Sequence, residues 1–155
     1  MSIQPQDVAD GESSMAGVTC DLATTPVSRV RRLVRSLLGG HRGVLLDDAV
    51  LVADELVSNA IQHGEGPRSC RFTLIDDGWG LRTEVTDTGR GEPHLRTPDN
   101  SGGRGLLLVD RLANVWGVRW FPGHKTVWAE VLMDVTERKR RAPHLSITRT
   151  WPRPS

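Results

Sequence analysis

The stretch that decides the fold runs from Leu46 to His63, LDDAVLVADELVSNAIQH, and is followed by Gly64. At about 100° of helical turn per residue, its apolar side chains fall on one broad stripe, which comprises Leu46, Ala49, Val50, Ala53, Leu56, Val57 and Ala60. Glu55 and Asn59 lie one turn apart on the opposite side. The stretch therefore predicts an amphipathic helix that ends at Gly64 and presents a carboxylate and a carboxamide away from the core. Any solvent-exposed helix also has a polar face, so this helix alone does not separate a ligand site from a plain surface.

The composition is that of one soluble globular domain. The chain has 155 residues, of which 37% are hydrophobic and 25% charged, and this length is enough to bury a core. A formal net charge of +1 gives no general attraction to nucleic acids or membranes. We find no signal peptide and no apolar run of the roughly 18 residues that a membrane helix needs, and so expect a cytoplasmic protein. Cys20 and Cys70 lack metal-ligand spacing and are expected to be reduced and buried as small apolar residues.

Composition also divides the chain into three parts. Residues 1–17 are rich in Gln, Asp, Ser and Gly and are expected to form a disordered leader, whereas residues 18–135 form the ordered domain. Residues 136–155 begin with a basic run and end in Pro, Arg, Thr and Ser, which predicts a disordered tail. Because neither aromatic stacking nor a fold supports it, we interpret this tail as solvated and not as a nucleic-acid contact.

Within residues 18–135, strand and helix patterns follow one another. Apolar residues at alternate positions predict strands at 18–22, 71–75, 81–86, 115–121 and 126–132. Helices are predicted at 26–38, with Thr25 as the N-cap and Pro26 as the first helical residue, at 46–63, and from Arg104 to near Ala113. This order predicts an α+β fold, a two-layer α/β sandwich with the helices on one face of a mixed, mostly antiparallel sheet.

Two groups of side chains have a structural explanation beside a functional one. The first predicted helix carries four arginines, which form either a partner-binding surface or, more commonly, a solvated helix face: Arg29, Arg31, Arg32 and Arg35. Three tryptophans near the end of the domain alternate with polar positions and are expected to pack in the core or on a sheet face: Trp116, Trp120 and Trp128.

Two glycine-rich motifs downstream suit the same ligand as Glu55 and Asn59. The first, Asp87-Thr-Gly-Arg-Gly91, follows a predicted strand, and Gly89 and Gly91 let a ligand approach the backbone closely. The second, Gly102-Gly-Arg-Gly-Leu106, lies where a loop enters a helix, so its N–H groups and Arg104 favour phosphate. Residues 92–103 have no periodicity and predict a functional loop such as a lid.

Each of these groups has a use for a magnesium nucleotide. The Asn59 carbonyl oxygen is a hard donor that suits a magnesium ion bridging phosphates. Glu55 can take the proton of a hydroxyl or water that attacks the terminal phosphate. The Asp87 carboxylate can accept a hydrogen bond from an exocyclic amine, which favours adenine over guanine. Taken singly these signals are weak, because glycine-rich turns are mostly only turns, but the three in this order are more specific.

At these residues the chain resembles the GHKL superfamily of ATP-binding proteins, which includes gyrase and the histidine kinases. The segment from Glu55 to Ala60 resembles its N box, Asp87 to Gly91 its first glycine box, and Gly103 to Leu106 its second. The short length and the pattern from Glu55 to His63 are most similar to the small bacterial anti-sigma-factor serine/threonine kinases. The resemblance covers residues 18–132, which is essentially the whole expected domain.

The resemblance implies an ATP- and magnesium-dependent kinase with Glu55 as the catalytic base, Asn59 holding magnesium and Asp87 binding adenine. Thr126, on the last strand, matches the place of a threonine near the adenine. The residues implied around the phosphates are Gly89, Gly91, Gly103, Arg104, Gly105 and Leu106.

Kinases of this kind phosphorylate a serine or threonine of an anti-anti-sigma partner and sequester a sigma factor as dimers. The resemblance therefore implies phosphate transfer and protein partners for this chain. The alternative is a non-catalytic module, in which ATP creates a surface that holds a sigma factor or another regulator. Both readings use the same nucleotide-positioning residues, so the sequence leaves them open.

Overall fold

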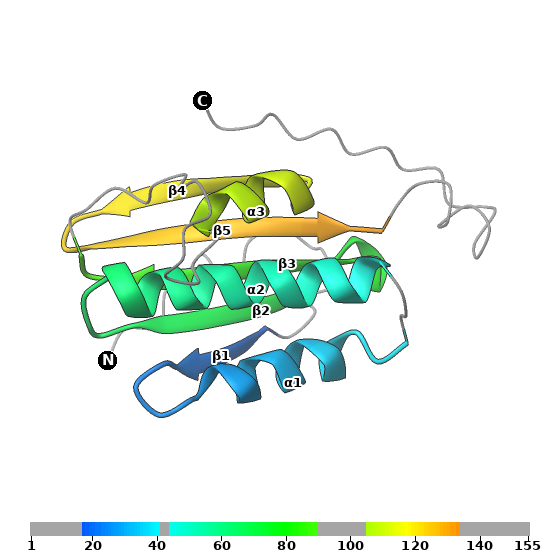
Figure 1. Ribbon diagram of the computed structural model, residues 1–155, viewed down its shortest axis with the longest axis horizontal. Coiled ribbons are helices and arrows are strands. Elements are labelled where there is room, and N and C mark those ends of the chain that lie inside the picture. The colour runs from blue at the N-terminus through cyan, green and yellow to red at the C-terminus, as the bar shows by residue number, and fades with distance from the viewer. Residues whose placement is uncertain (1–16, 41–43, 90–104, 134–155) are drawn as a thin grey trace.

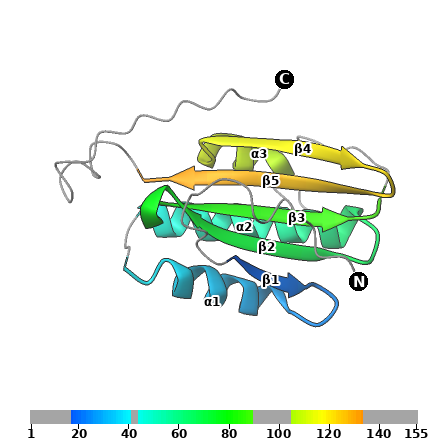
Figure 2. The ribbon, with the colours of Figure 1, turned by 180° about the vertical axis from the view of Figure 1, so that it is seen from behind.

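The computed structural model describes residues 17–40, 44–89 and 105–133, which form two packed layers (Figure 1). One layer is a sheet with strands β1 (Val18–Asp21), β2 (Ser69–Ile75), β3 (Gly80–Asp87), β4 (Val115–Phe121) and β5 (His124–Leu132). The other layer holds helices α1 (Val27–Leu37), α2 (Val44–His63) and α3 (Gly105–Leu112). Figure 2, from behind, shows the sheet in front of α2 and α3, with α1 next to β1 at the lower edge, so the predicted α+β sandwich is confirmed.

The strand order in the sheet is β1-β2-β3-β5-β4. Every pairing between described strands is antiparallel, so the sheet is more regular than the mixed one that we expected. The reason is that β2 and β3 form one hairpin, and β4 and β5 form a second whose later strand lies beside β3. The carboxyl end of β3 thereby lies next to the start of β5.

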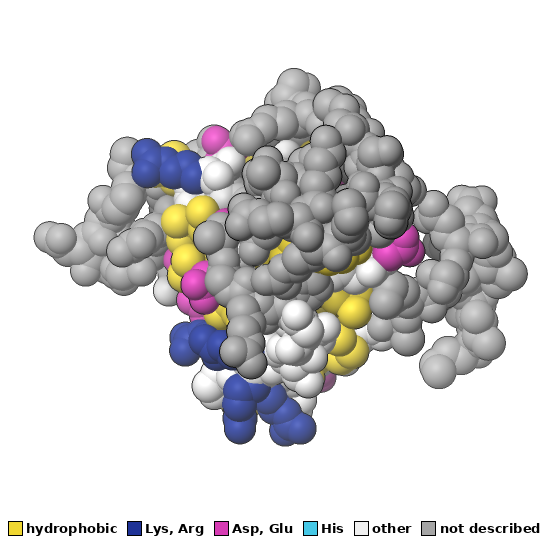
Figure 3. Space-filling view, turned by 90° about the vertical axis from the view of Figure 1, so that its right-hand side faces the viewer, with side chains coloured by type: hydrophobic (Ala, Val, Ile, Leu, Met, Phe, Trp, Pro, Cys, Tyr) yellow, Lys and Arg dark blue, Asp and Glu magenta, His cyan; other side chains and the backbone are white. Residues whose placement is uncertain are grey.

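Helix α1 is amphipathic, as its sequence predicts. Val30 and Val34 are fully buried, while the four arginines of the helix are exposed. In Figure 3 basic side chains lie along the lower margin, the level at which α1 runs in Figure 1. The helix begins at Val27, one residue later than predicted, because Pro26 takes the cap position with an extended backbone and no side chain caps the helix.

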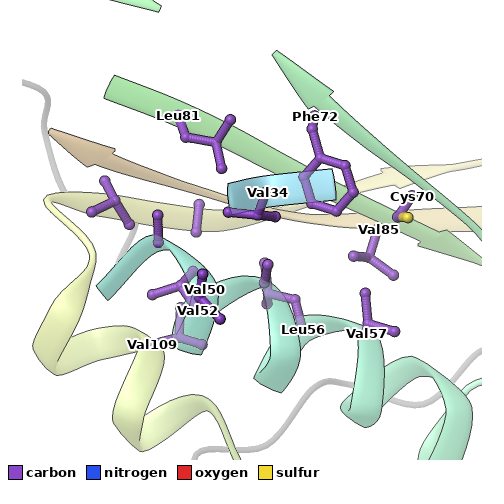
Figure 4. Packing of buried hydrophobic residues seen from close by; sticks show 14 of the residues in the cluster. Val34, Val50, Val52, Leu56, Val57, Cys70, Phe72, Leu81, Val85 and Val109 are labelled. Carbon is purple, nitrogen blue, oxygen red and sulfur yellow. The ribbon is translucent and has the colours of Figure 1, made fainter. Parts of the chain in front are cut away.

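The core lies between α2 and the sheet. Six of the seven apolar positions of the predicted stripe are buried and the seventh, Leu46, packs against them, which confirms the stripe. Figure 4 shows Leu56 and Val57 of α2 facing Phe72 and Val85 of the sheet. Val52, outside the stripe, is buried as well because α3 packs on that side of α2.

Strand β3 carries the core pattern to its last residue. Leu81, Thr83 and Val85 are buried on the side of the helices, and Asp87 is the next residue on the same side. The pleat alternates side chains between the two faces, so this strand delivers a carboxylate to the helix-covered face of the sheet. The β2–β3 hairpin closes through the 3-10 turn η2 (Asp76–Gly78), where Asp76, Asp77 and Gly78 have positive φ.

The tryptophans follow the prediction only in part. Trp116 packs against the core and donates its Nε1–H to Asp110 Oδ1 at 2.9 Å. Trp128 lies on the open sheet face beneath two arginine side chains. The prediction was wrong for Trp120, which is 53% exposed because it lies near the end of β4, past the residues that α3 covers.

The two cysteines lie opposite each other on the neighbouring strands β1 and β2. Cys70 is buried and Cys20, directly opposite it, is half-buried, and both are free thiols. The predicted leader and tail, residues 1–17 and 136–155, lie almost wholly outside the described residues. In the described part of the chain, no helix combines the length and apolar character needed to cross a membrane.

Candidate functional site

The site forms where the end of α2 meets the end of β3. Helix α2 closes with a hydrogen bond from the Gly64 N–H to the Ala60 carbonyl at 2.9 Å. Gly64 then lies against the Asp87 carboxylate: a Cβ placed on Gly64 would stand 2.7 Å from Asp87 Cγ and 2.9 Å from Oδ2. The helix ends at Gly64 as predicted, but its φ is not in the left-handed region, so this glycine is required for the close approach of Asp87.

Arg68 holds the end of α2 in place. Its Nε–H donates to the Ala60 carbonyl at 2.8 Å and its Nη2–H to the Gly64 carbonyl at 2.7 Å. A guanidinium at this position satisfies carbonyls that a helix end leaves without intrahelical partners and suits the negative end of the helix dipole.

Thr88 joins the end of β3 to the same turn. Its N–H donates to the Glu65 carbonyl at 3.0 Å, and its hydroxyl donates to the Gly66 carbonyl at 2.7 Å. These two hydrogen bonds tie the first glycine motif to the turn that follows α2, so the end of α2 and the end of β3 form one corner.

Asp87 is the buried charge at this corner, at 2% exposure. Its Oδ1 accepts the Gly89 N–H at 2.7 Å and the Lys125 Nζ at 3.2 Å. Lys125 Nζ also donates to the Gly89 carbonyl at 3.0 Å. Among the described residues, both donors to this carboxylate bind Oδ1. The other oxygen, Oδ2, lies on the side of Gly64.

Glu55 and Asn59 lie on α2, both half-buried, with the core stripe of the helix on the other side. At 1.5 Å of rise per residue, Asn59 lies about 7.5 Å and Glu55 about 13.5 Å before Gly64 along the helix axis. Because Asp87 contacts Gly64, the three polar groups follow one another in the order Asp87, Asn59, Glu55.

Thr126 does not join this group. Its Oγ1 lies 2.8 Å from Thr86 Oγ1, on the open face of the sheet, whereas Asp87 faces the helices. The strand register pairs Asp87 with Lys125 and Thr86 with Thr126, and the pleat sends successive side chains to opposite faces. We expected Thr126 near the adenine, but the residue that lies beside Asp87 is Lys125.

The second glycine motif is only partly described. Gly105 begins α3, and Leu106 is fully buried in the core, so its side chain packs instead of meeting a ligand. Gly91, Gly103, Arg104 and the expected lid at residues 92–102 lie outside the described residues.

A surface cavity of about 470 Å³ opens beside Gly89. It is lined by Thr88 and Gly89 of the first glycine motif and by the tip of the β4–β5 hairpin, which contributes Trp120, Phe121, Gly123 and His124. The Phe121 and His124 rings stack with centroids 4.6 Å apart. The corner that holds Asp87 thus borders an open, aromatic-walled space.

Sequence reasoning missed Lys125 and Arg68 as parts of this corner. A lone lysine near a hairpin turn resembles a solvated residue, and only the β3–β5 register shows that it faces a carboxylate. An arginine four residues after Gly64 carries a weak signal, because basic side chains near a helix end commonly bind its last carbonyls.

The chain matches the family model described as histidine kinase-like ATPase domain over residues 21–131. No curated protein matches it. The matched segment contains Glu55, Asn59, Asp87 and both glycine motifs, so it includes the whole corner.

Similar solved structures include the RsbU and RsbW domains of a Mycobacterium tuberculosis protein, which match at 21% identity and a TM-score of 0.55, over 76% of this chain and 32% of that chain. This chain therefore spans about a third of that one. A blue-light activated histidine kinase domain from Erythrobacter litoralis matches at 20% identity and a TM-score of 0.44, over 90% of this chain and 72% of that chain. At such identities the first likeness shows the fold alone.

Proposed function

The chain belongs to the histidine kinase-like ATPase domain family, and from this premise we propose that it is an anti-sigma-type serine/threonine protein kinase that uses ATP and magnesium. Its substrate would be a serine or threonine of an anti-anti-sigma partner, and it would also hold a sigma factor. The family supports ATP binding, while the protein partners rest on the resemblance in motif and on the fold that the chain shares with a structure containing an RsbW domain.

The observation that carries the proposal is the order of polar groups along α2. Asp87 lies at the helix end, and Asn59 and Glu55 follow at about 7.5 and about 13.5 Å along the axis. An extended nucleoside triphosphate presents its base, its phosphates and its reacting γ-phosphate in this same order. Asp87 would accept the adenine amine, Asn59 would lie beside the phosphates and Glu55 beside the attacking hydroxyl.

Magnesium fits the chemistry of this arrangement. An ion that bridges nucleotide phosphates takes one or two oxygen ligands from the protein and the rest from phosphate and water. Asn59, half-buried on the side of α2 away from the core stripe, would supply a neutral carbonyl oxygen for it. When bound, the ion would neutralise charge on the phosphates, and Arg104 and the glycines at 89, 91, 103 and 105 would complete their surroundings.

Glu55 would act as the base. As the substrate hydroxyl attacks the γ-phosphorus, its proton passes to the Glu55 carboxylate, the phosphoryl group transfers to the serine or threonine oxygen, and ADP leaves. A carboxylate on a packed helix is held in position by its backbone, which is the contribution that phosphoryl transfer needs most from a protein.

Phosphate transfer from labelled ATP to purified anti-anti-sigma proteins of the source organism tests this proposal. Glu55→Gln should bind ATP as the wild type does and lose nearly all transfer, whereas the control Asp47→Asn, which changes an exposed carboxylate near the start of the same helix, should keep it. Undiminished transfer by Glu55→Gln would remove the role of Glu55. ATP-dependent complex formation without transfer would instead support the alternative, a non-catalytic ATP-gated binding module.

A further inference from the structure

Lys125 is a buried lysine, with 4% of its surface exposed. A lysine is rarely buried without a partner, because removing an ammonium group from water is costly. Here its Nζ forms a 3.2 Å ion pair with Asp87 Oδ1, and the two side chains are 5% and 3% exposed. The corner between α2 and β3 thus contains an ion pair of opposite charges instead of a single carboxylate.

The ammonium group of Lys125 has three contacts among the described residues. Its Nζ lies 3.2 Å from Asp87 Oδ1, 3.0 Å from the Gly89 carbonyl oxygen and 5.8 Å from the centroid of the Trp120 ring. The Gly89 N–H donates to the same Oδ1 at 2.7 Å. Lys125 Nζ and the Gly89 N–H therefore both bind Oδ1 of Asp87 and fix that oxygen.

We propose that Lys125 is a positioning residue that sets base selectivity: by pairing with Asp87 Oδ1 it fixes the orientation of the carboxylate and leaves Oδ2 to accept from the 6-amino group of a purine. This inference rests on the proposed nucleotide site. It adds the residue that lets Asp87 distinguish a 6-amino purine from a 6-oxo purine.

The physical basis is that a carboxylate only accepts hydrogen bonds, so it binds a 6-amino group and repels a 6-oxo group. This preference depends on an oxygen of Asp87 that is held toward the base. The Lys125 ammonium group fixes Oδ1, so without it the other oxygen is no longer held in one direction. Removing the lysine charge should therefore weaken the preference for 6-amino purines, in addition to any effect on stability.

The experiment compares ATP with inosine triphosphate, which carries a 6-oxo group, by calorimetry on the wild type and on Lys125→Met. The ratio of the inosine triphosphate Kd to the ATP Kd should fall about tenfold in Lys125→Met, since charge-assisted hydrogen bonds are roughly twice as strong as neutral ones. The matched control is Arg82→Met, which breaks a 3.1 Å ion pair with buried Glu130 on the opposite sheet face and should leave the ratio unchanged.

An unchanged ratio in Lys125→Met, or tighter ATP binding by that variant, would overturn the inference. Carbon-13 NMR of the wild type, labelled at aspartate carboxyls, gives an independent readout if Lys125→Met does not fold. The Asp87 carboxyl resonance should then move on addition of ATP and move less on addition of inosine triphosphate, and equal movement with both nucleotides would overturn the inference. A wild type that binds neither nucleotide would contradict the proposed function itself, whereas ATP binding with an unchanged ratio removes only the role of Lys125.

Discussion

Replacing Gly64 with alanine should damage both stability and nucleotide binding. The new methyl group would stand 2.6 Å from the Ala60 carbonyl oxygen and 2.7 Å from Asp87 Cγ. Neither neighbour can move easily, because the carbonyl belongs to a capped helix end and the carboxylate to a buried ion pair. Overpacking of this kind costs about 1–3 kcal/mol, and the loss of unfolded-state freedom returns about 0.4–1 kcal/mol.

We therefore expect the free energy of unfolding of Gly64→Ala, from urea denaturation, to fall by about 1–2 kcal/mol. Because the clash falls on Asp87, the ATP Kd from calorimetry should rise about tenfold, equivalent to about 1.4 kcal/mol. Gly40→Ala is the control, since nothing lies within 4 Å of its Cβ position. If the two variants showed the same stability and the same ATP affinity, the contact between α2 and Asp87 would not have the role given to it here.

The Asp87–Lys125 pair, the Arg68 cap and the Cys70 thiol lead to further expectations. Asp87→Asn and Lys125→Met should each lower the free energy of unfolding by about 3–5 kcal/mol, and the double variant by less than their sum, because each single change leaves a buried partner uncompensated; additive losses in denaturation would contradict the pair. Arg68→Met should cost about 1–2 kcal/mol and speed hydrogen exchange in the last turn of α2; unchanged exchange there would exclude the cap. Burial raises the pKa of the Cys70 thiol from 9.0 to about 12, and the neighbouring Cys20 makes a smaller contribution in the same direction. Only the unfolded thiol ionises between these values, so stability falls by up to about 1.4 kcal/mol per pH unit as pH rises through that window. Cys70→Ala should lack this part of the slope.

The parts of the fold that the sequence predicts are those with local signals. The apolar stripe of α2 repeats at the helical period, and β3 alternates at the period of a strand, so both elements and their buried faces follow from the sequence. Asp87 and Gly89 are likewise recognisable because their spacing and their place after a strand lie within one short segment.

The parts that escaped prediction depend on pairing between distant segments. Whether Lys125 or Thr126 faces the helices is decided by the register between β3 and β5, and a shift of one residue exchanges the two faces. The charge of Lys125 suggests a solvated residue, and nothing nearby in sequence shows the carboxylate that it meets. Trp120 was misplaced for a related reason, because its burial depends on how far α3 extends over β4.

The most direct test of the central claim is a calorimetric titration of the chain with ATP, GTP and ADP, with and without magnesium. We expect ATP to bind in preference to GTP, and magnesium to strengthen the binding of ATP. Asp87→Asn should weaken that binding, because its carboxamide can present an N–H to the adenine amine in place of an oxygen. If no adenine nucleotide bound to the wild type, the assignment of the corner between α2 and β3 as a nucleotide site would be wrong.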